Sequence, residues 1–352
     1  MPSAHSARPN RWHIRSPEDA AQFLSKKARN AFKAWGRPHI LVVGAPEEGM
    51  TNAIGADLNA RGMVPVVLML EDLRAHAVPE PERYACILCA YTDIRRTAAV
   101  AGIILADDRL SHLTFEYVTF PAASYAALIR HQAESALDKV SPLPTYPFDV
   151  FQHYEASLED FEKKCDIRDY MDVCQLLKTV RDNAIPGDVA EFGSYRGHSS
   201  YLMAGVMAEL GLDKRLLLFD TFDTFPKEPL GIDRFWSGSH PVEFEAVRRK
   251  FAPYPFVTFI KGDFTQTFDT APVDMLSFVY VDCDAYRSTA YLIRRIFPEV
   301  LAPGGIMVFE DYGHAQLLGN RAAVHHYFDN RSGCVQFFSQ FSGCYIVIKL
   351  AA

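Results

Sequence analysis

Short apolar runs alternate with amphipathic stretches along the first third of this chain. The apolar runs are bounded by glycine or polar residues, and they predict buried strands at residues 39–45, 64–70, 84–90 and 115–120. Helical periodicity between and after them predicts helices at residues 50–61, 93–106 and 122–139. Strands that alternate with helices are typical of a parallel sheet covered by helices.

The same alternation returns in the second half of the chain. Five further strands are predicted at residues 188–193, 215–220, 256–260, 276–281 and 305–309. Helices are predicted at residues 158–165, 170–183, 198–210, 243–251, 288–300 and 321–329. The last two strands, residues 335–338 and 345–350, are joined by a short loop containing Gly343. Because so short a connection cannot make a crossover, these two strands should form an antiparallel hairpin.

A proline-rich stretch separates the two blocks. Residues 141–147 include three prolines in seven residues, which disfavours both helix and strand. We therefore predict an N-terminal extension (1–36), a small α/β domain (37–140), a linker (141–153) and a larger domain (154–352). The small domain is expected to make subunit contacts or to shape an acceptor site, in a homo-oligomer that is a dimer or larger.

The composition excludes several classes of protein. The 352 residues are 49% hydrophobic and 22% charged, which is enough apolar surface for folded domains. The formal net charge of −7 argues against non-specific nucleic-acid binding. No apolar run approaches the ~20 residues of a membrane span, and the N-terminus lacks the apolar stretch of a secretory signal. Seven cysteines, an odd number, favour reduced thiols and a cytoplasmic protein, with Cys86 and Cys89 as core residues.

Glycines and acids follow five successive strands of the second block. They are Glu191 with the turn to Gly197, then Asp220, Asp263, the pair Asp282 and Asp284, and the pair Glu310 and Asp311. Ligands bind beyond the carboxyl ends of the strands in sheets of this kind. A single glycine turn could equally serve tight packing, and a single aspartate could cap a helix. Acids at the ends of five strands in a row favour a ligand site instead.

Four motifs in this block resemble those of the macrocin O-methyltransferase family, whose members modify sugars with S-adenosylmethionine (SAM). In order along the chain they are Ile185-Pro-Gly-Asp-Val-Ala-Glu-Phe-Gly-Ser-Tyr-Arg-Gly197, Asp220-Thr-Phe-Asp-Thr-Phe-Pro226, Asp282-Cys-Asp-Ala-Tyr-Arg-Ser-Thr289, and Pro303-Gly-Gly305 followed by Glu310-Asp-Tyr-Gly-His314. The resemblance covers residues 183–327. Glu310 stands where the family usually has Asp, and Ala285 where it usually has Trp, which could reshape the acceptor pocket. The first block has no counterpart in the family's smaller members.

The resemblance implies a Rossmann-like class I methyltransferase domain, with a mostly parallel seven-stranded sheet that ends in an antiparallel hairpin. It implies that SAM contacts Glu191, Gly193, Ser194, Tyr195, Gly197, Asp220, Thr221, Phe222, Asp263 and Asp282. It also implies that Asp282, Glu310 and Asp311 hold a divalent cation such as Mg²⁺, and that Asp284 acts as the base.

The residue chemistry agrees with these roles. A sugar hydroxyl is a weak acid, and a nearby cation stabilises the alkoxide that attacks the methyl group. Acids that end adjacent strands, about 4.8 Å apart, can reach one ion. Asp282 and Asp284 point to the same side if the backbone stays extended, so one could bind the ion while the other faces the acceptor. Asp284 is the first candidate for the base and His314 the second, although His314 could equally be a loop residue.

We therefore predict a SAM-dependent, metal-assisted O-methyltransferase that acts on a hydroxyl of a sugar, a glycosylated metabolite or a polysaccharide. Two alternatives stay open: a catechol-type O-methyltransferase that acts on an aromatic diol, and a non-catalytic SAM-binding scaffold. The segment 229–240 is a candidate lid over the site, or a packed surface loop.

Overall fold

The computed structural model of the chain describes residues 14, 16–75, 78, 80–119 and 150–351. The chain forms two compact units. The first unit contains residues 1–134 and 228–235, and the second contains residues 135–227 and 236–352. The predicted helix at 122–139 and the proline-rich stretch at 141–147 lie outside the described residues.

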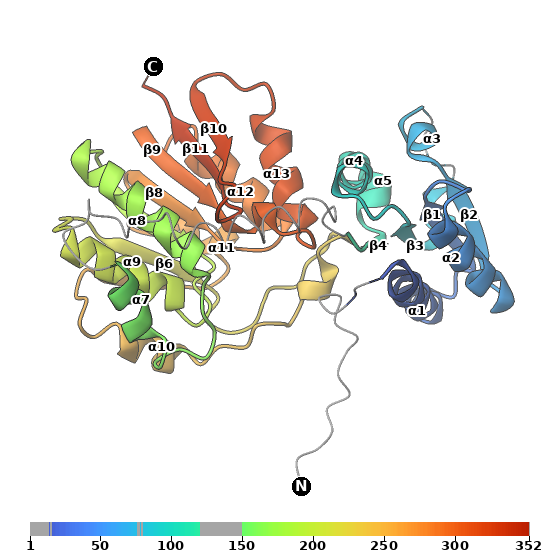
Figure 1. The fold of residues 1–352 in the computed structure, drawn as a ribbon, viewed down its shortest axis with the longest axis horizontal. Coiled ribbons are helices and arrows are strands. Elements are labelled where there is room, and N and C mark those ends of the chain that lie inside the picture. Colours follow the sequence, from blue (N-terminus) through green and yellow to red (C-terminus); the bar gives the residue numbers. More distant parts are fainter. Residues whose placement is uncertain (1–13, 15, 76–77, 79, 120–149, 352) are drawn as a thin grey trace, which may run out of the picture. The chain divides into compact units, whose positions relative to one another are not determined.

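The first unit is built on a four-stranded parallel sheet, blue to cyan in Figure 1. Its strands, in spatial order, are β2 (Val64–Leu68), β1 (His39–Val43), β3 (Tyr84–Cys89) and β4 (Thr114–Glu116). Its helices are α1 (Pro17–Trp35), α2 (Gly49–Ala60), α3 (Leu70–Ala75), α4 (Ile94–Ala106) and α5 (Asp108–Ser111), with a short 3₁₀ turn at Pro81–Arg83. Cys86 and Cys89 are free thiols within β3, where burial raises the pKa of Cys89 to about 12. Their interpretation as core residues is confirmed.

Helix α1 belongs to the core of this unit, which differs from the predicted N-terminal extension. Ser16 caps the helix by accepting a hydrogen bond from the Asp19 N–H, and Gly36 ends it in a left-handed conformation. Leu24 and Ala28 are fully buried against the sheet. Burial of this apolar face explains why the segment folds with the domain that follows it.

A segment from the second half of the chain completes the first unit. Residues 228–235 pack there, and the Gly231 N–H donates a hydrogen bond to the carbonyl of Ser111 at 2.9 Å. The Arg234 guanidinium donates to the carbonyl of His112 at 2.5 Å and to the hydroxyl of Thr114 at 2.9 Å. This part of the candidate lid is therefore a structural segment of the first unit.

The second unit contains a seven-stranded sheet in the order β10-β11-β9-β8-β5-β6-β7. The five parallel strands are β5 (Asp188–Phe192), β6 (Leu216–Asp220), β7 (Val257–Lys261), β8 (Leu276–Val281) and β9 (Leu301–Phe309). The two last strands, β10 (Cys334–Phe338) and β11 (Tyr345–Lys349), pair antiparallel, as predicted. This arrangement confirms the predicted class I methyltransferase fold.

Helices cover both faces of this sheet (Figure 1). One core lies under α7 (Val150–Ser157), α8 (Ile167–Asp182), α9 (His198–Glu209) and α10 (Phe244–Lys250). The other core lies under α12 (Tyr286–Ile296) and α13 (Leu318–Phe328). The short helix α11 (Phe264–Thr267) follows β7. No helix in the described part of the chain is both long and apolar enough to cross a membrane.

The predicted helix at 158–165 is wrong. Helix α7 precedes this segment, and residues 158–166 form turns and irregular backbone that we call the strap. Tertiary contacts fix the strap: Phe161 is buried, and the Cys165 N–H donates to Nδ1 of His198 at 2.9 Å. These contacts override a helical pattern that was too short to be stable alone.

Candidate functional site

The carboxyl ends of neighbouring strands bring the predicted acids together. In the sheet, β8 lies between β5 and β9, and Val281 is in register with both Phe192 and Phe309. The residues that directly follow β8 and β9 are therefore adjacent at one edge. Those residues are Asp282 and Glu310, and the latter opens the 3₁₀ turn Glu310–Gly313.

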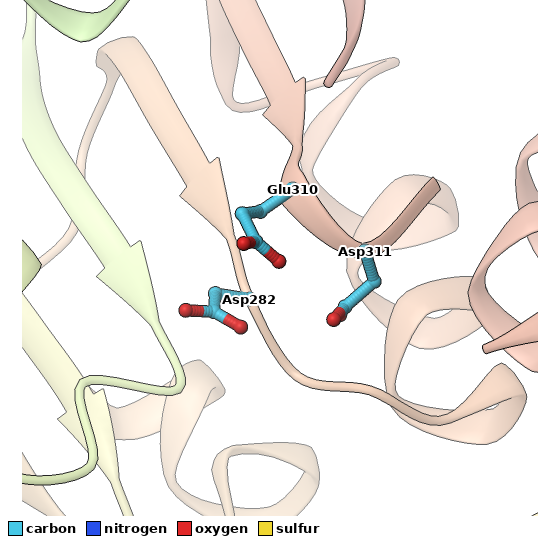
Figure 2. Close-up of side chains that lie close together, drawn as sticks. All are labelled: Asp282, Glu310 and Asp311. Atoms are coloured by element: carbon cyan, nitrogen blue, oxygen red, sulfur yellow. The ribbon is translucent and has the colours of Figure 1, made fainter. Parts of the chain in front are cut away.

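Asp282, Glu310 and Asp311 form one cluster, and Figure 2 shows their carboxylates converging from the ends of two strands. One carboxylate oxygen from each residue lies within 4.8 Å of the other two. Asp311 is 2% exposed. This is the arrangement that adjacent strand ends predicted.

Burial and mutual repulsion dominate the electrostatics of the cluster. Burial, then the charges of Glu310 and Asp311, raise the pKa of Asp282 well above its usual range. Burial also raises the pKa of Glu310, and burial together with Asp284 and Glu310 raises that of Asp311. Three acids this close, with Asp311 buried and the other two partly buried, need protons or a cation to neutralise them. Three convergent carboxylates form an oxygen-donor set of the kind that Mg²⁺ prefers, so the residues fit a divalent cation.

Asp284 is attached to the cluster through its backbone. Its N–H donates a hydrogen bond to Oδ2 of Asp311 at 2.8 Å, and its φ is +59°. The backbone therefore leaves the extended conformation after Asp282, and the expected common orientation of Asp282 and Asp284 does not follow from strand geometry. Burial, then the charges of Glu310 and Asp220, raise the pKa of Asp284 to about 7.

His314 follows the 3₁₀ turn that carries Glu310 and Asp311. Its N–H donates to the backbone carbonyl of Asp311 at 3.0 Å, and its Nδ1 accepts from the Gln316 N–H at 3.2 Å. Burial lowers its pKa. The accepted hydrogen bond favours the neutral ring with the proton on Nε2.

The glycine turn after β5 has specific structural reasons for its glycines. A Cβ on Gly193 would lie 1.6 Å from the carbonyl oxygen of Asp282, so only glycine permits the close approach of the two strand ends. Gly197, at φ +86°, caps α9, and a Cβ there would come within 3.1 Å of Phe251. The turn thus lies directly against the acid cluster.

Glu191 anchors α9 behind this turn. It is fully buried, and its carboxylate accepts hydrogen bonds from the hydroxyls of Ser199, at 2.5 Å, and Ser200. Burial raises its pKa to about 7. These contacts give Glu191 a positioning role, whereas its predicted contact with a cofactor stays a prediction.

Asp220 connects the turns after β5 and β6. Its carboxylate accepts hydrogen bonds from the N–H groups of Tyr195, at 2.8 Å, and Phe222, at 2.6 Å, and from the Thr221 hydroxyl at 3.3 Å. A carboxylate offers about four acceptor positions, so one remains for a ligand. The Phe222 ring is 1% exposed and packs in the core against Phe244, which places it away from the surface of the site.

Three non-glycine residues in the turns that follow strands β5, β6 and β8 adopt left-handed conformations. They are Tyr195 at φ +47°, Phe222 at +45° and Asp284 at +59°. Such strain costs of order 1–3 kcal/mol per residue and concentrates at functional sites. Strained residues after three neighbouring strands therefore indicate a functional site at this edge of the sheet.

Asp263 follows β7 and caps helix α11. Its Oδ1 accepts from the N–H and hydroxyl of Thr265, at 2.9 and 2.7 Å, and its Oδ2 lies 3.7 Å from Arg287. This is the helix-capping role that was the alternative to ligand binding for a single aspartate. Because β7 is next to β6 in the sheet, Asp263 still follows a strand at the same edge as Asp220, and its contact with SAM stays a prediction. Ala285, where the family usually has Trp, is fully buried.

A cavity of about 330 Å³ lies over the glycine turn and the acid cluster. It brings together several predicted residues, namely Gly193, Ser194, Tyr195, Gly197, Asp282 and Glu310. Sequence reasoning missed the remaining lining residues, which come from the strap and its neighbours: Lys163, Lys164, Cys165, Asp166, Asp169 and His198. The strap had been assigned to a helix, and no motif marked it.

Asp169 is the most notable of the missed residues. It lies in the first turn of α8, is 5% exposed, and is contacted by the Cys344 thiol at 3.6 Å. Burial, then the charge of Glu310, raise its pKa to about 8. An acid near a helix start is common as a surface residue, so only the tertiary structure reveals its place beside Glu310.

Comparison with known proteins supports the resemblance found in the motifs. Residues 168–334 match the family described as Macrocin-O-methyltransferase (TylF), which confirms the resemblance for that segment. A relative from Streptomyces olivaceus, 8-demethyl-8-(2,3-dimethoxy-alpha-L-rhamnosyl)-tetracenomycin-C 4'-O-methyltransferase, is 32% identical over 164 residues, 43% of this chain and 61% of the relative. Mycinamicin III 3''-O-methyltransferase from Micromonospora griseorubida is 29% identical over 168 residues, 44% of this chain and 65% of the relative.

Solved structures also give partial matches. The structure of the O-methyltransferase NovP aligns with a TM-score of 0.48 and 25% identity, over 53% of this chain and 81% of that one. The alignments with the two curated relatives span less than two thirds of each relative's length.

Proposed function

We propose that the second unit is a SAM-dependent O-methyltransferase, assisted by a divalent cation, that methylates a hydroxyl of a sugar or a glycosylated compound. The observation that carries this proposal is the set of three carboxylates within 4.8 Å of one another beside the glycine turn. The family match over residues 168–334 supports this reaction type. The names of the two relatives describe methylation of a rhamnosyl-bearing compound and of mycinamicin III, which supports a sugar acceptor.

The cofactor would lie over the turn from Gly193 to Gly197, with Asp220 at its ribose. SAM supplies a methyl group on a positively charged sulfur. The remaining acceptor position of Asp220 suits one ribose hydroxyl, because the other positions hold the two turns in place. The acids around the cavity also favour a cofactor that carries a net positive charge.

The acid cluster would serve the acceptor oxygen. Asp282, Glu310 and Asp311 would hold the cation, whose charge stabilises a developing alkoxide. Asp284 would take the proton of the acceptor hydroxyl as the C–O bond to the methyl group forms and the C–S bond breaks. Burial and the neighbouring acids raise the pKa of Asp284 to about 7. A cation held by the cluster would lower this pKa, so Asp284 would be ionised and able to accept the proton.

The test combines binding and transfer. Isothermal titration should show SAM binding to the wild-type protein, and tritiated SAM should transfer its label to sugars or glycosides in an acceptor panel that also contains catechols. Asp282→Ala should abolish transfer while SAM affinity stays within a few-fold of wild type. The matched control is Asp274→Ala, which removes an exposed acid elsewhere in the same unit.

The outcomes separate the alternatives. Transfer only to catechols would replace the sugar acceptor with an aromatic diol. SAM binding without transfer to any acceptor would favour the non-catalytic scaffold. An Asp282→Ala protein that remains active in the presence of a chelator would contradict the role of the cation.

A further inference from the structure

The strap, residues 158–166, presents two lysines to the cavity. Lys163 and Lys164 line it together with the glycine turn and the acids Asp282 and Glu310. His198 fixes the strap, because its Nδ1 accepts from the Cys165 N–H and its Nε2 lies 2.9 Å from the Ser157 hydroxyl. The lysines therefore project from a segment whose backbone is held in place.

These two lysines have charges that no described acid neutralises. Neighbouring basic residues are paired: Arg196 with Glu162, and Arg168 with Asp166 at 2.7 Å. Neither Lys163 nor Lys164 makes an ion pair with any residue that the structure describes. Two unneutralised ammonium groups at one wall of a cavity attract an anion.

The field of these cations reaches both histidines near the cavity. After burial, Lys164 and Lys250 lower the pKa of His198 to about 4. After burial, Lys163 and Arg196 lower the pKa of His240. The ring of His240 lies 5.0 Å from that of Tyr195, which itself lines the cavity. Each of the two lysines thus contributes positive potential at a histidine near the cavity.

The cofactor alone does not account for this wall. SAM carries an ammonium, a sulfonium and a single carboxylate, so its net charge is positive. The first turn of α9, a 12-residue helix that begins after Gly197, offers free N–H groups that suit that one carboxylate. A phosphate ester carries about −1.5 to −2 charge near neutral pH, which matches two lysines.

We propose that the acceptor is a phosphorylated sugar, with its phosphate on Lys163 and Lys164 and its reacting hydroxyl at the acid cluster. This inference rests on the proposed function and specifies its substrate class. A sugar phosphate and a nucleoside diphosphate sugar share this chemistry, and the arms of the experiment distinguish them.

The experiment measures oxyanion binding to the full chain saturated with S-adenosylhomocysteine, in metal-free buffer. Calorimetric titrations use glucose 1-phosphate, TDP and the neutral methyl glucoside. The variant is Lys163→Met with Lys164→Met, which keeps the length of the aliphatic chains. Its controls are Lys178→Met, which removes a lysine paired with Asp182 on α8, and the conservative double change to Arg.

We expect the wild-type protein to bind glucose 1-phosphate or TDP, and the Lys178→Met and double Arg variants to bind it with similar affinity. The double Met variant should bind it at least about tenfold more weakly than the wild type. Its affinity for S-adenosylhomocysteine should stay within twofold of wild type. Stronger binding of TDP than of glucose 1-phosphate indicates a nucleoside diphosphate sugar, and the reverse a sugar phosphate.

Three results would overturn the proposal: no oxyanion binding by the wild-type protein, equal oxyanion binding by the double Met variant, or a loss of affinity confined to S-adenosylhomocysteine. The last result would assign the lysines to the cofactor.

Failure of the proposed function is a separate result. Oxyanion binding that depends on the lysines, without methyl transfer to any acceptor, contradicts the enzyme and leaves the anion site. Methyl transfer to neutral glycosides that the double Met variant retains in full would support the enzyme and contradict the anion site.

Discussion

The backbone N–H of Asp284 donates a 2.8 Å hydrogen bond to the carboxylate of Asp311, although the two residues follow different strands. This contact connects the loop after β8 with the turn after β9. It holds a fourth acid beside the cluster of Asp282, Glu310 and Asp311 without placing it within the cluster. The proposed base, Asp284, and the proposed cation ligands in the cluster can therefore be tested separately.

Divalent cations should stabilise the second unit. Because three adjacent carboxylates repel one another, a bound cation relieves a cost that the folded state alone carries. A cation at 100 times its dissociation constant adds about 2.7 kcal/mol, enough to raise Tm by several degrees. Thermal unfolding in MgCl₂ and in NaCl of matched ionic strength measures the difference. Asp282→Asn should lose the shift and Asp274→Asn should keep it; an equal shift in both would place the cation elsewhere.

Asp284 and His314 should differ as candidate bases. Asp284→Asn removes the proton acceptor, and we expect kcat to fall by about 10²–10⁴-fold, while the rise in Tm with Mg²⁺ persists. His314→Asn should reduce kcat far less, since the amide oxygen of Asn can still accept the Gln316 N–H that Nδ1 of His314 accepts. Single-turnover methyl transfer measures both variants. A larger loss in His314→Asn than in Asp284→Asn would reverse the assignment.

The sequence predicted the sheet of the second unit and its acid cluster because both depend on local patterns. Buried strands are short apolar runs, and acids that directly follow adjacent strands meet wherever the strands are parallel. The strap and Asp169 could not be predicted this way, since their places depend on tertiary contacts with His198 and Cys344. The same holds for residues 228–235, whose place in the first unit no local pattern marks. The homo-oligomer and the cytoplasmic location stay predictions.

His198 should make the folded state sensitive to acid. Burial, followed by Lys164 and Lys250, lowers its pKa from the usual 6.5 to about 4. The unfolded state therefore binds more protons between these values, so stability present above pH 6.5 is lost as the pH falls toward 4. In His198→Asn, the amide oxygen can still accept the Cys165 N–H and does not titrate. Urea unfolding at pH 7 and pH 5 should show a smaller loss for this variant than for the wild type.

The matched control for this experiment is His325→Asn, a change at a partly exposed histidine on α13. It should leave the difference between pH 7 and pH 5 as in the wild type. An identical loss in His198→Asn and the wild type would show that His198 is not the titrating group.

Gly231 should be indispensable to the first unit. A Cβ at this position would lie 1.4 Å from the carbonyl oxygen of Leu113, which directly precedes β4, so Gly231→Ala forces the backbone apart. We expect a loss of about 3–5 kcal/mol in the free energy of unfolding. Gly55→Ala is the matched control, since nothing lies within 4 Å of its Cβ inside α2. That change should stabilise the helix by about 0.5–1 kcal/mol.

Hydrogen exchange of the β3 and β4 amides reports on the first unit directly, whichever unit unfolds first. Exchange in Gly231→Ala should accelerate at these amides and stay unchanged in the β5 and β8 amides of the second unit. Because residues 228–235 follow β6 in the chain, this pattern would show that a segment from the second half of the chain is a structural element of the N-terminal unit. Unchanged protection of β3 and β4 would instead mean that the segment packs on this unit without stabilising it.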